Sequence, residues 1–346
     1  MAVSSPNALL EPELLERIKG LALVARRVVE GGLHGMHQAP LHGLSVEFAQ
    51  HRAYTPGDEI KHLDWRVLGR SDRYVVKQYQ QETNLRAVLF VDCSRSMAFG
   101  GSRASGGQPQ AGAGANQGPG EGPADGRSKF HYARRLAAAL SYLMLHQGDS
   151  VGLVLTSDRI VGQVSPQATP GQITSLCRAL ERARPGGETN VSGVLSQLAP
   201  RLKRRSLVIV IGDLLDDPLR VLSALGQLGS RGHELLVFQV LDPREIEFDL
   251  GLAGYGMTVI RDMETGAEFD AEPALIRDLV RAEIQRFFER LDAGARRHGI
   301  PLLRCATDDP IERVLTEYLH TRLRQRGVRR TSPAASRRAA GSRPRE

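Results

Sequence analysis

Apolar and polar positions follow different patterns in the two parts of this 346-residue chain. Residues 10–30 repeat apolar side chains at helical spacing, which predicts an amphipathic helix. Residues 43–85 are polar, aromatic and rich in turn residues, with strand-like pieces at 44–49 and 73–80. From residue 86 onward, short apolar runs alternate with longer amphipathic segments, which is typical of an α/β fold.

The apolar runs of the second part predict the strands of one sheet. The run at 87–91 is β-branched and aromatic and does not alternate with polar residues, as expected of a strand buried on both faces. Further strands are expected at 150–156, 160–164, 207–211, 234–241 and 301–305, and a small hairpin near 257–269. Helices are expected at 129–147, 170–183, 190–202, 217–230, 273–298 and 309–324. We therefore predict an α/β fold with a doubly wound, mostly parallel sheet flanked by helices and an N-terminal helical and β-strand extension.

Changes in composition predict the boundaries of five parts. These are an N-terminal helical segment at 1–42, a segment at 43–85 that packs on the core, a sheet domain at 86–245, a C-terminal hairpin with helices at 246–320, and a tail at 321–346. Residues 98–128 contain ten glycines together with Ala, Gln, Pro and Ser, which indicates a flexible insertion. We expect limited proteolysis to cut this insertion first.

The positive charge of the chain is concentrated at its carboxyl end. Residues 321–346 contain nine arginines and one glutamate, a net charge of +8, whereas the whole chain carries +7, so the remainder carries −1. The tail has too few apolar residues to fold alone, and we expect it to be disordered. It is either a solvated end or a contact for nucleic acid or an acidic partner. Nothing else supports nucleic-acid binding, since aromatic residues make up only 5% of the chain.

The cysteines and the absence of long apolar stretches predict where the protein resides. Cys93, Cys177 and Cys305 are far apart and lie in or beside apolar segments, which indicates reduced and mostly buried thiols. No stretch approaches the roughly 18–20 apolar residues of a membrane span. The N-terminus lacks an apolar signal core. We expect a cytoplasmic protein without membrane insertion.

Polar side chains with oxygen atoms follow the strand at 87–91. Asp92, Ser94 and Ser96 alternate in the loop after this strand, and such a loop is where open α/β sheets bind ligands. One carboxylate and two hydroxyls are hard oxygen donors that suit Mg²⁺ or Mn²⁺ better than Zn²⁺. The alternative is an Asp and Ser turn that caps the next helix.

Two later loops add oxygen donors at the same edge of the predicted sheet. Thr189 precedes a predicted helix after Gly186-Gly187, and Asp213 follows the strand at 207–211. The ordered set of D-x-S-x-S, then Thr, then Asp resembles the metal-ion-dependent adhesion site of von Willebrand factor A domains. The resemblance implies that the serines and the threonine bind a divalent metal directly and that the aspartates act partly through water. One coordination position would remain open for an acidic residue of a protein partner, so we expect a binding module and not an enzyme.

The segment before the sheet resembles a bacterial family named domain of unknown function 58. The residues that carry this resemblance are Ser45-Val46-Glu47-Phe48, Arg52, Tyr54, Pro56-Gly57-Asp58, Leu63-Asp64-Trp65 and Arg70. Within the signature, Lys61, Leu63 and Gly69 stand where Arg, Ile and Ala are expected. Proteins of this family are commonly encoded beside MoxR-type AAA+ ATPases, so the resemblance implies an adaptor for such an ATPase. Physically, Trp65 is expected to anchor the segment on the sheet and Arg52 to pair with Asp58 or Asp64, although a partner-binding role stays open.

Other chemistries fit the sequence less well. A haloacid-dehalogenase-like phosphatase would use Asp92 as its nucleophile, and Gly212-Asp213 begins a similar metal motif, but Ser94 stands where such enzymes usually have an acid. The chain has no G-x-S-x-G nucleophile elbow and no P-loop. His34, His37 and His42 could bind Zn²⁺ but are more simply surface histidines, because no cysteine or H-E-x-x-H motif accompanies them.

Overall fold

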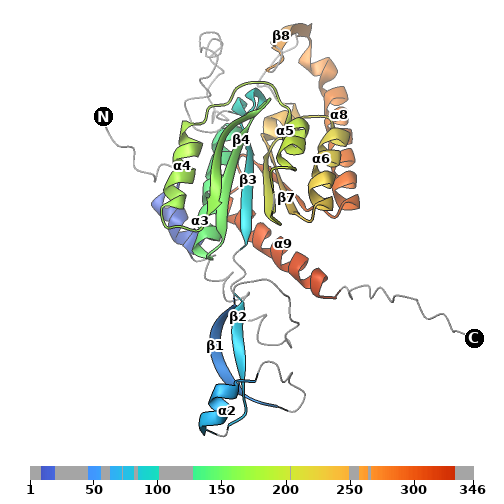
Figure 1. Ribbon diagram of the computed structural model, residues 1–346. Helices are drawn as coiled ribbons and strands as arrows, with labels where there is room; N and C mark the ends of the chain where they lie inside the picture. Colours follow the sequence, from blue (N-terminus) through green and yellow to red (C-terminus); the bar gives the residue numbers. More distant parts are fainter. Residues whose placement is uncertain are drawn as a thin grey trace, which may run out of the picture. The chain divides into compact units, whose positions relative to one another are not determined.

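The apolar runs predicted as strands form one six-stranded sheet in the computed structural model (Figure 1). The order is β10 (Leu302–Ala306), β7 (Glu234–Leu241), β6 (Leu207–Gly212), β3 (Arg86–Asp92), β4 (Ser150–Thr156) and β5 (Ile160–Gln167). All neighbours are parallel except β4 and β5. The central strands are buried almost throughout, whereas the edge strand β5 alternates between half-buried and exposed residues. The prediction of a mostly parallel α/β sheet is confirmed.

The structure describes part of the chain, in two units. The described residues are 9–19, 46–55, 63–71, 73–81, 85–100, 128–202, 204–248, 257–263 and 266–331. One unit comprises Met1–Arg26 with Arg86–Glu346, and the other comprises Arg27–Leu85. Each unit is described by itself.

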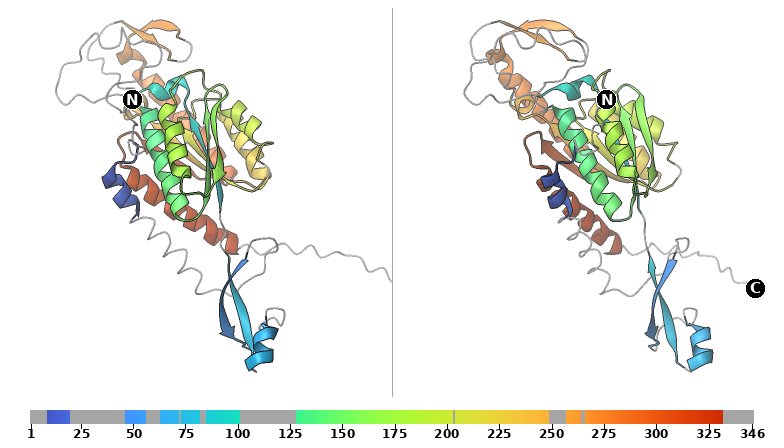
Figure 2. Two further views of the ribbon diagram at one scale, coloured as in Figure 1. Left: turned by 60° about the vertical axis from the view of Figure 1, so that its left-hand side comes forward. Right: turned by 90° about the vertical axis from the view of Figure 1, so that its left-hand side faces the viewer.

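Helices cover both faces of the sheet in the larger unit (Figures 1 and 2). One face packs against α5 (Val191–Leu198), α6 (Pro218–Ser230) and α8 (Pro273–Arg297). The other face carries α3 (Lys129–His146), which also contacts α4 (Gln172–Arg182) and α9 (Ile311–Thr331). The alanines at 137–139 are all buried although consecutive helical residues point about 100° apart, so α3 is covered on most of its surface.

Some elements differ from their predicted bounds. The short helices η2 (Arg95–Ala98) and α7 (Pro243–Glu247) lie in segments without a helical period, because each spans about one turn. The predicted small hairpin consists of β8 (Thr258–Arg261) and β9 (Glu268–Ala271). The helix α9 continues to Thr331, so the predicted boundary at 320 falls inside a helix. Residues 332–346 and 101–127, which hold most of the tail and of the insertion, lie outside the described residues.

The smaller unit is a two-stranded antiparallel ribbon with one helix. Its strands are β1 (Val46–Ala53) and β2 (Val75–Gln81), and α2 spans Trp65–Ser71. Asp64 begins α2, since its Oδ1 accepts the backbone N–H of Arg66 at 3.0 Å. Trp65, expected as a buried anchor, is 61% exposed. The expected pairing of Arg52 lies outside the described side chains.

The three cysteines are unpaired and buried, as predicted. Among the described residues, no helix has both the length and the apolar character needed to span a bilayer.

Candidate functional site

The strand order places Asp92 and Asp213 beside each other. β3 and β6 are parallel neighbours, and the chain winds outward from them in opposite directions, which leaves a crevice at their carboxyl ends. Asp92 is the last residue of β3, and Asp213 directly follows β6. A Cβ on Gly212 would lie 2.7 Å from the Cβ of Asp92, so only glycine allows this close approach.

The loop after β3 directs its two serine hydroxyls at each other. Asp92 Oδ1 accepts the backbone N–H of Ser94 at 2.8 Å, which closes a turn. Ser94 precedes η2, but its side chain does not cap that helix. Its Oγ lies 3.1 Å from Ser96 Oγ instead. Asp92 therefore forms the turn that the alternative interpretation predicted, but Ser94 does not cap the helix. The two serine hydroxyls contact each other in a polar cluster.

The loop that carries Thr189 is fastened to the loop after β3. Gly186 donates its N–H to the carbonyl of Cys93 at 2.9 Å, and Arg95 donates to the carbonyl of Gly187 at 3.0 Å. Gly187 has a φ of +76°, a left-handed conformation that favours glycine. As a result, Thr189 Oγ1 lies 3.3 Å from Ser96 Oγ.

Asp213 completes the cluster from β6. Its Oδ2 accepts the hydroxyl of Ser96 at 2.8 Å, and its Oδ1 accepts the backbone N–H of Leu215 at 3.2 Å. All five residues predicted from the sequence therefore gather at one crevice. We call Asp92, Ser94, Ser96, Thr189 and Asp213 the oxygen cluster.

Asp92 is the least satisfied member of the oxygen cluster. It is 1% exposed, and its Oδ2 has no hydrogen-bond partner in the structure. Burial and then the charge of Asp213 raise the pKa of Asp92 to about 7, against the opposing hydrogen bonds from Ser94. A buried carboxylate oxygen without a partner is costly, and a bound cation would remove that cost.

Sequence reasoning missed two charged residues beside the oxygen cluster. Lys129, the first residue of α3, is fully buried and donates to Asp213 Oδ2 at 2.8 Å and to Glu245 Oε1 at 2.7 Å. Burial alone lowers the pKa of Lys129, but the two carboxylates outweigh it and the pKa lies above its ordinary value. For Glu245, burial raises the pKa of the carboxyl above its ordinary value, and the ammonium of Lys129 opposes this rise only in part. The one sequence signal was a lysine in a helix's first turn, where the macrodipole disfavours a cation.

The donors of the oxygen cluster fit Mg²⁺ or Mn²⁺. Three hydroxyls and two carboxylates supply only hard oxygen ligands, and Mg²⁺ keeps several waters when few protein ligands reach it. Ser94, Ser96, Thr189 and Asp92 would hold the ion, since the oxygens of Asp213 already accept three hydrogen bonds. Within the described ranges, no group of three or more His, Cys, Asp or Glu side chains is arranged to hold a metal. His34, His37 and His42 lie outside those ranges.

A groove of about 580 Å³ adjoins the oxygen cluster. Cys93 and Gly187 from the two fastened loops line it, together with three arginines and Asp158. The arginines are Arg159, Arg182 and Arg184, and all three are exposed. The groove is therefore basic, and it shares the two fastened loops with the oxygen cluster, although no member of the cluster lines it.

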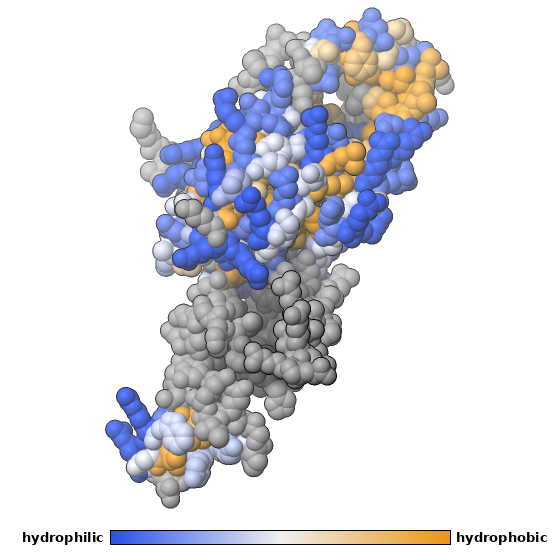
Figure 3. Space-filling view, turned by 45° about the vertical axis from the view of Figure 1, so that its right-hand side comes forward, coloured by the Kyte–Doolittle hydropathy of each residue, from blue (hydrophilic) through white to orange (hydrophobic). Residues whose placement is uncertain are grey.

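Exposed apolar residues gather elsewhere on the larger unit. Figure 3 shows a hydrophobic surface over the β8–β9 hairpin and the start of α8. Its residues are Met257, Val259, Met263, Phe269, Leu275 and Leu279. The hairpin lies toward the end of the sheet at which β3 terminates (Figures 1 and 2). Leu215 and Leu219, which follow Asp213, are also exposed.

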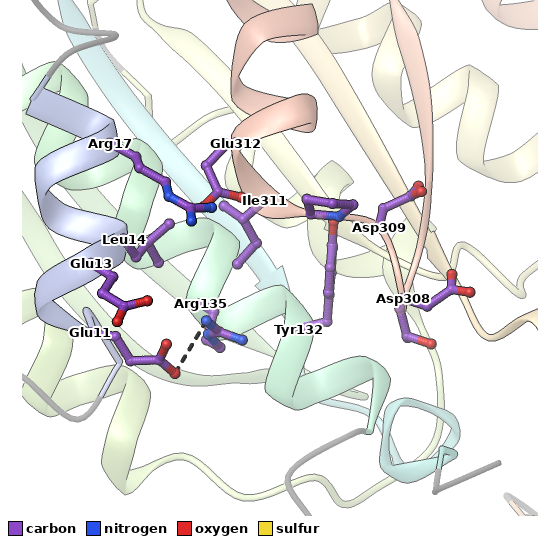
Figure 4. A pocket seen from close by; sticks show the side chains of 12 residues that line it. Glu11, Glu13, Leu14, Arg17, Tyr132, Arg135, Asp308, Asp309, Ile311 and Glu312 are labelled. Atoms are coloured by element: carbon purple, nitrogen blue, oxygen red, sulfur yellow. Dashed lines mark hydrogen bonds and ion pairs between the residues drawn. The ribbon is translucent and has the colours of Figure 1, made fainter. Parts of the chain in front are cut away.

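A second pocket, of about 270 Å³, lies apart from the oxygen cluster where the helix at 12–19 meets α3 and α9 (Figure 4). Arg135 pairs with Glu11 at 3.3 Å, and Arg17 pairs with Glu312 at 3.0 Å. These pairs connect the N-terminal helix to the body, so we assign the pocket a structural role.

Comparisons with known proteins give relatives without a described activity. The chain is 27% identical over 305 residues to the uncharacterized protein Mb1516 of Mycobacterium bovis, covering 86% of each chain. It is 32% identical over 131 residues to the uncharacterized protein MAV169 of Mycobacterium avium, covering 37% of this chain and 72% of that one.

Solved structures match over most of their own length. The conserved hypothetical protein BatB from Bacteroides thetaiotaomicron matches with a TM-score of 0.40 and 14% identity, over 70% of this chain and 99% of that one. An aerotolerance-related membrane protein from Bacteroides fragilis matches with a TM-score of 0.39 and 17% identity, over 68% and 99%.

The family comparison covers most of the chain. Residues 50–115 and 122–293 match a single family, and the two ranges include β3, β6 and every member of the oxygen cluster. The match therefore agrees with the resemblance seen in the segment before the sheet. The chain belongs to the family described as Protein of unknown function DUF58.

Proposed function

We propose that this protein is a non-enzymatic, cytoplasmic binding module with a von Willebrand A-like core. Its metal-ion-dependent adhesion site would capture a carboxylate of a protein partner through Mg²⁺ or Mn²⁺. The observation that carries the proposal is the convergence of three hydroxyls with two carboxylates at the crevice, beside the unpartnered Oδ2 of Asp92. A metal held by so few protein oxygens keeps waters, which an incoming carboxylate can replace.

The surroundings of the oxygen cluster favour a protein as the partner. The exposed side chains of Leu215 and Leu219 next to Asp213 offer apolar contact area. The basic groove offers charge complementary to an acidic segment. By the family resemblance, we propose a MoxR-type AAA+ ATPase as this partner.

The alternative function is a haloacid-dehalogenase-like phosphatase with Asp92 as nucleophile. Such an enzyme needs an acid to protonate the leaving group, and the usual position is occupied by Ser94. The hydroxyl of Ser94 cannot fill this role at neutral pH. We therefore favour binding over catalysis, and expect wild type with Mg²⁺ to leave p-nitrophenyl phosphate unhydrolysed.

The test compares wild type with Asp92→Ala, and with Asp278→Asn on the exposed surface of α8 as a matched control. Each full-length protein is immobilised and presented with a purified MoxR-type ATPase from the same genome, in Mg²⁺ and in EDTA. We expect retention only by wild type and the control, and only with Mg²⁺. Equal retention by Asp92→Ala in Mg²⁺ would contradict the proposal.

A pull-down from lysate, read by mass spectrometry, extends this test to other partners. If no partner depends on both Mg²⁺ and Asp92, the oxygen cluster is structural. Phosphate release by wild type that Asp92→Ala abolishes would favour the phosphatase instead.

A further inference from the structure

The ammonium of Lys129 places a positive charge next to the oxygen cluster, where a bound metal would place a second one. Its side chain is fully buried, and its ammonium contacts Asp213 at 2.8 Å and Glu245 at 2.7 Å. It also lies 5.9 Å from the centre of the Phe99 ring. A buried lysine is retained only where carboxylates balance it, so these contacts determine where the ammonium lies.

The two aspartates of the oxygen cluster differ in their hydrogen bonds, because Lys129 donates to Asp213 and not to Asp92. Asp213 Oδ2 accepts from both Ser96 and Lys129, which uses both lone-pair directions of that oxygen. Asp213 Oδ1 accepts from Leu215. Asp92 Oδ2, by contrast, has no partner. A metal at this site would therefore find an unpartnered carboxylate oxygen on Asp92, whereas Asp213 has one oxygen fully used by Ser96 and Lys129 and the other already accepting one hydrogen bond.

Glu245 shares the ammonium with Asp213 from a different element. It lies in α7 and forms a capping box with Asp242, in which the backbone N–H of Asp242 donates to Glu245 Oε2 at 3.4 Å. This box holds Glu245 Oε1 in place for Lys129. Without the charge on Glu245, the ammonium would interact with Asp213 alone.

We propose that Lys129 and Glu245 are positioning residues that set the metal affinity of the oxygen cluster. Lys129 keeps Asp213 from binding the metal directly, which leaves the bound ion with little negative charge from the protein and ready for an external carboxylate. Glu245 moderates this effect by drawing part of the ammonium's charge away from Asp213. This inference rests on the proposed metal site and adds what controls its strength.

The proposal predicts opposite effects for two substitutions. Lys129→Met removes the positive charge and frees Asp213, so metal affinity should rise. Glu245→Gln removes one of the two carboxylates that pair with Lys129. The ammonium then interacts more strongly with Asp213, so metal affinity should fall. For a unit charge one side chain away and an effective protein dielectric of about 20, we expect each change to be roughly 30-fold, and at least about 10-fold. A merely structural role would instead weaken metal binding in both variants.

The experiment titrates full-length protein with Mn²⁺ and follows the free ion by electron paramagnetic resonance, with Mg²⁺ competition as a second readout. Circular dichroism and thermal unfolding check that each variant is folded. Glu234→Gln is the matched control, because Glu234 also pairs with a cation, Arg322 at 2.8 Å, but lies at the opposite end of β7. Its Mn²⁺ affinity should stay within about twofold of wild type.

The outcomes separate this inference from the proposed function. Tighter binding by Lys129→Met with weaker binding by Glu245→Gln supports the inference. Changes of the same sign, or no change in Glu245→Gln, overturn it. If Lys129→Met does not fold, the double variant Lys129→Met/Glu245→Gln replaces it, and its Mn²⁺ affinity must exceed that of Glu245→Gln alone, because removing the ammonium frees Asp213 whether or not Glu245 is charged. If wild type itself does not bind Mn²⁺, the proposed metal site fails, and this inference fails with it.

Discussion

At the residue scale, the proposed metal site lowers the stability of the fold when no cation is bound. Asp92 is buried beside Asp213 with one oxygen unpartnered, an arrangement that costs free energy in the absence of a cation. Residues that break local rules of burial are commonly functional. Asp92 breaks these rules, which supports its proposed role as a metal ligand.

The substitution Asp92→Asn should separate stability from metal binding. Asparagine keeps an acceptor for the N–H of Ser94 but removes a buried charge, so metal-free protein should be more stable at pH 8, because a carboxyl whose pKa is raised by folding destabilises the folded state above that pKa. Wild type should gain about 2.7 kcal/mol with Mg²⁺ at 100 times its dissociation constant, whereas the variant should gain nothing. Urea unfolding with and without Mg²⁺ measures both effects. A lower metal-free stability of the variant would contradict this view of Asp92.

The three thiols should be inert in the folded protein. Burial raises the pKa of Cys177 to about 11 and that of Cys93 and Cys305 to about 12. Since only the thiolate reacts, and its fraction falls tenfold per unit of pH below the pKa, we expect no labelling by Ellman's reagent at pH 8. Three thiols should react after unfolding in guanidinium. Rapid labelling of native protein would show that a cysteine lies in an exposed environment.

At the element scale, the N-terminal helix is held to the body mainly by apolar contacts. Ile18 is fully buried and Leu14 nearly so, whereas Arg17 and its partner Glu312 form a surface pair. Figures 1, 2 and 4 show this helix beside α3 and α9. Buried aliphatic side chains contribute more to stability than exposed ion pairs.

Two substitutions on neighbouring residues should show this difference. Ile18→Ala should lower the free energy of unfolding by about 2–5 kcal/mol, because it leaves a cavity. Arg17→Gln should lower it by less than about 1 kcal/mol, because the pair is exposed to solvent. Urea denaturation monitored by circular dichroism measures both. Similar losses in the two variants would mean that the ion pair, and not the apolar face, attaches the helix.

At the scale of the whole molecule, the residues on either side of the long insertion are held together by backbone contacts. Gly100 and Ser128 form an antiparallel bridge, and the N–H of Lys129 donates to the carbonyl of Phe99 at 2.8 Å. The ends of the insertion are therefore held together beside Lys129. The prediction that proteolysis first cuts this insertion concerns residues outside the described ranges and stays a prediction.

Replacing residues 102–126 with a short Gly-Ser linker should preserve both fold and metal binding. Because loop-closure entropy grows by about 0.6 kcal/mol for each doubling of length, a fourfold shortening should raise stability by about 1 kcal/mol. The control also removes Gly100 and Ser128 and should lose stability, since the bridge is lost. Urea unfolding and Mn²⁺ titration of both variants provide the measurements. Loss of Mn²⁺ binding in the shortened protein would show that the insertion contributes to the site.

Local patterns along the chain predicted most elements and the oxygen donors after the strands, and the resemblance to the metal-ion-dependent adhesion site then selected the five members of the oxygen cluster. Periodicity distinguishes the buried strands from the amphipathic helices, and parallel strands place their carboxyl ends at one edge. The loops that end in Asp92, Thr189 and Asp213 could therefore be assigned to the same edge before their distances were known. The exposure of Trp65 and the extent of α9 were not predictable in this way, because each depends on what packs beside it.

Only the tertiary structure decided which charges meet at the site. Lys129 and Glu245 are separated by 116 positions in the chain, and neither has a local signature that predicts the other. They meet at Asp213 because β6 and β7 are neighbours and α3 begins at the same edge. By itself, the sequence determined the elements and the donor types, since these follow from short-range spacing and side-chain chemistry. The pairing of buried charges follows from long-range packing, which no local pattern records.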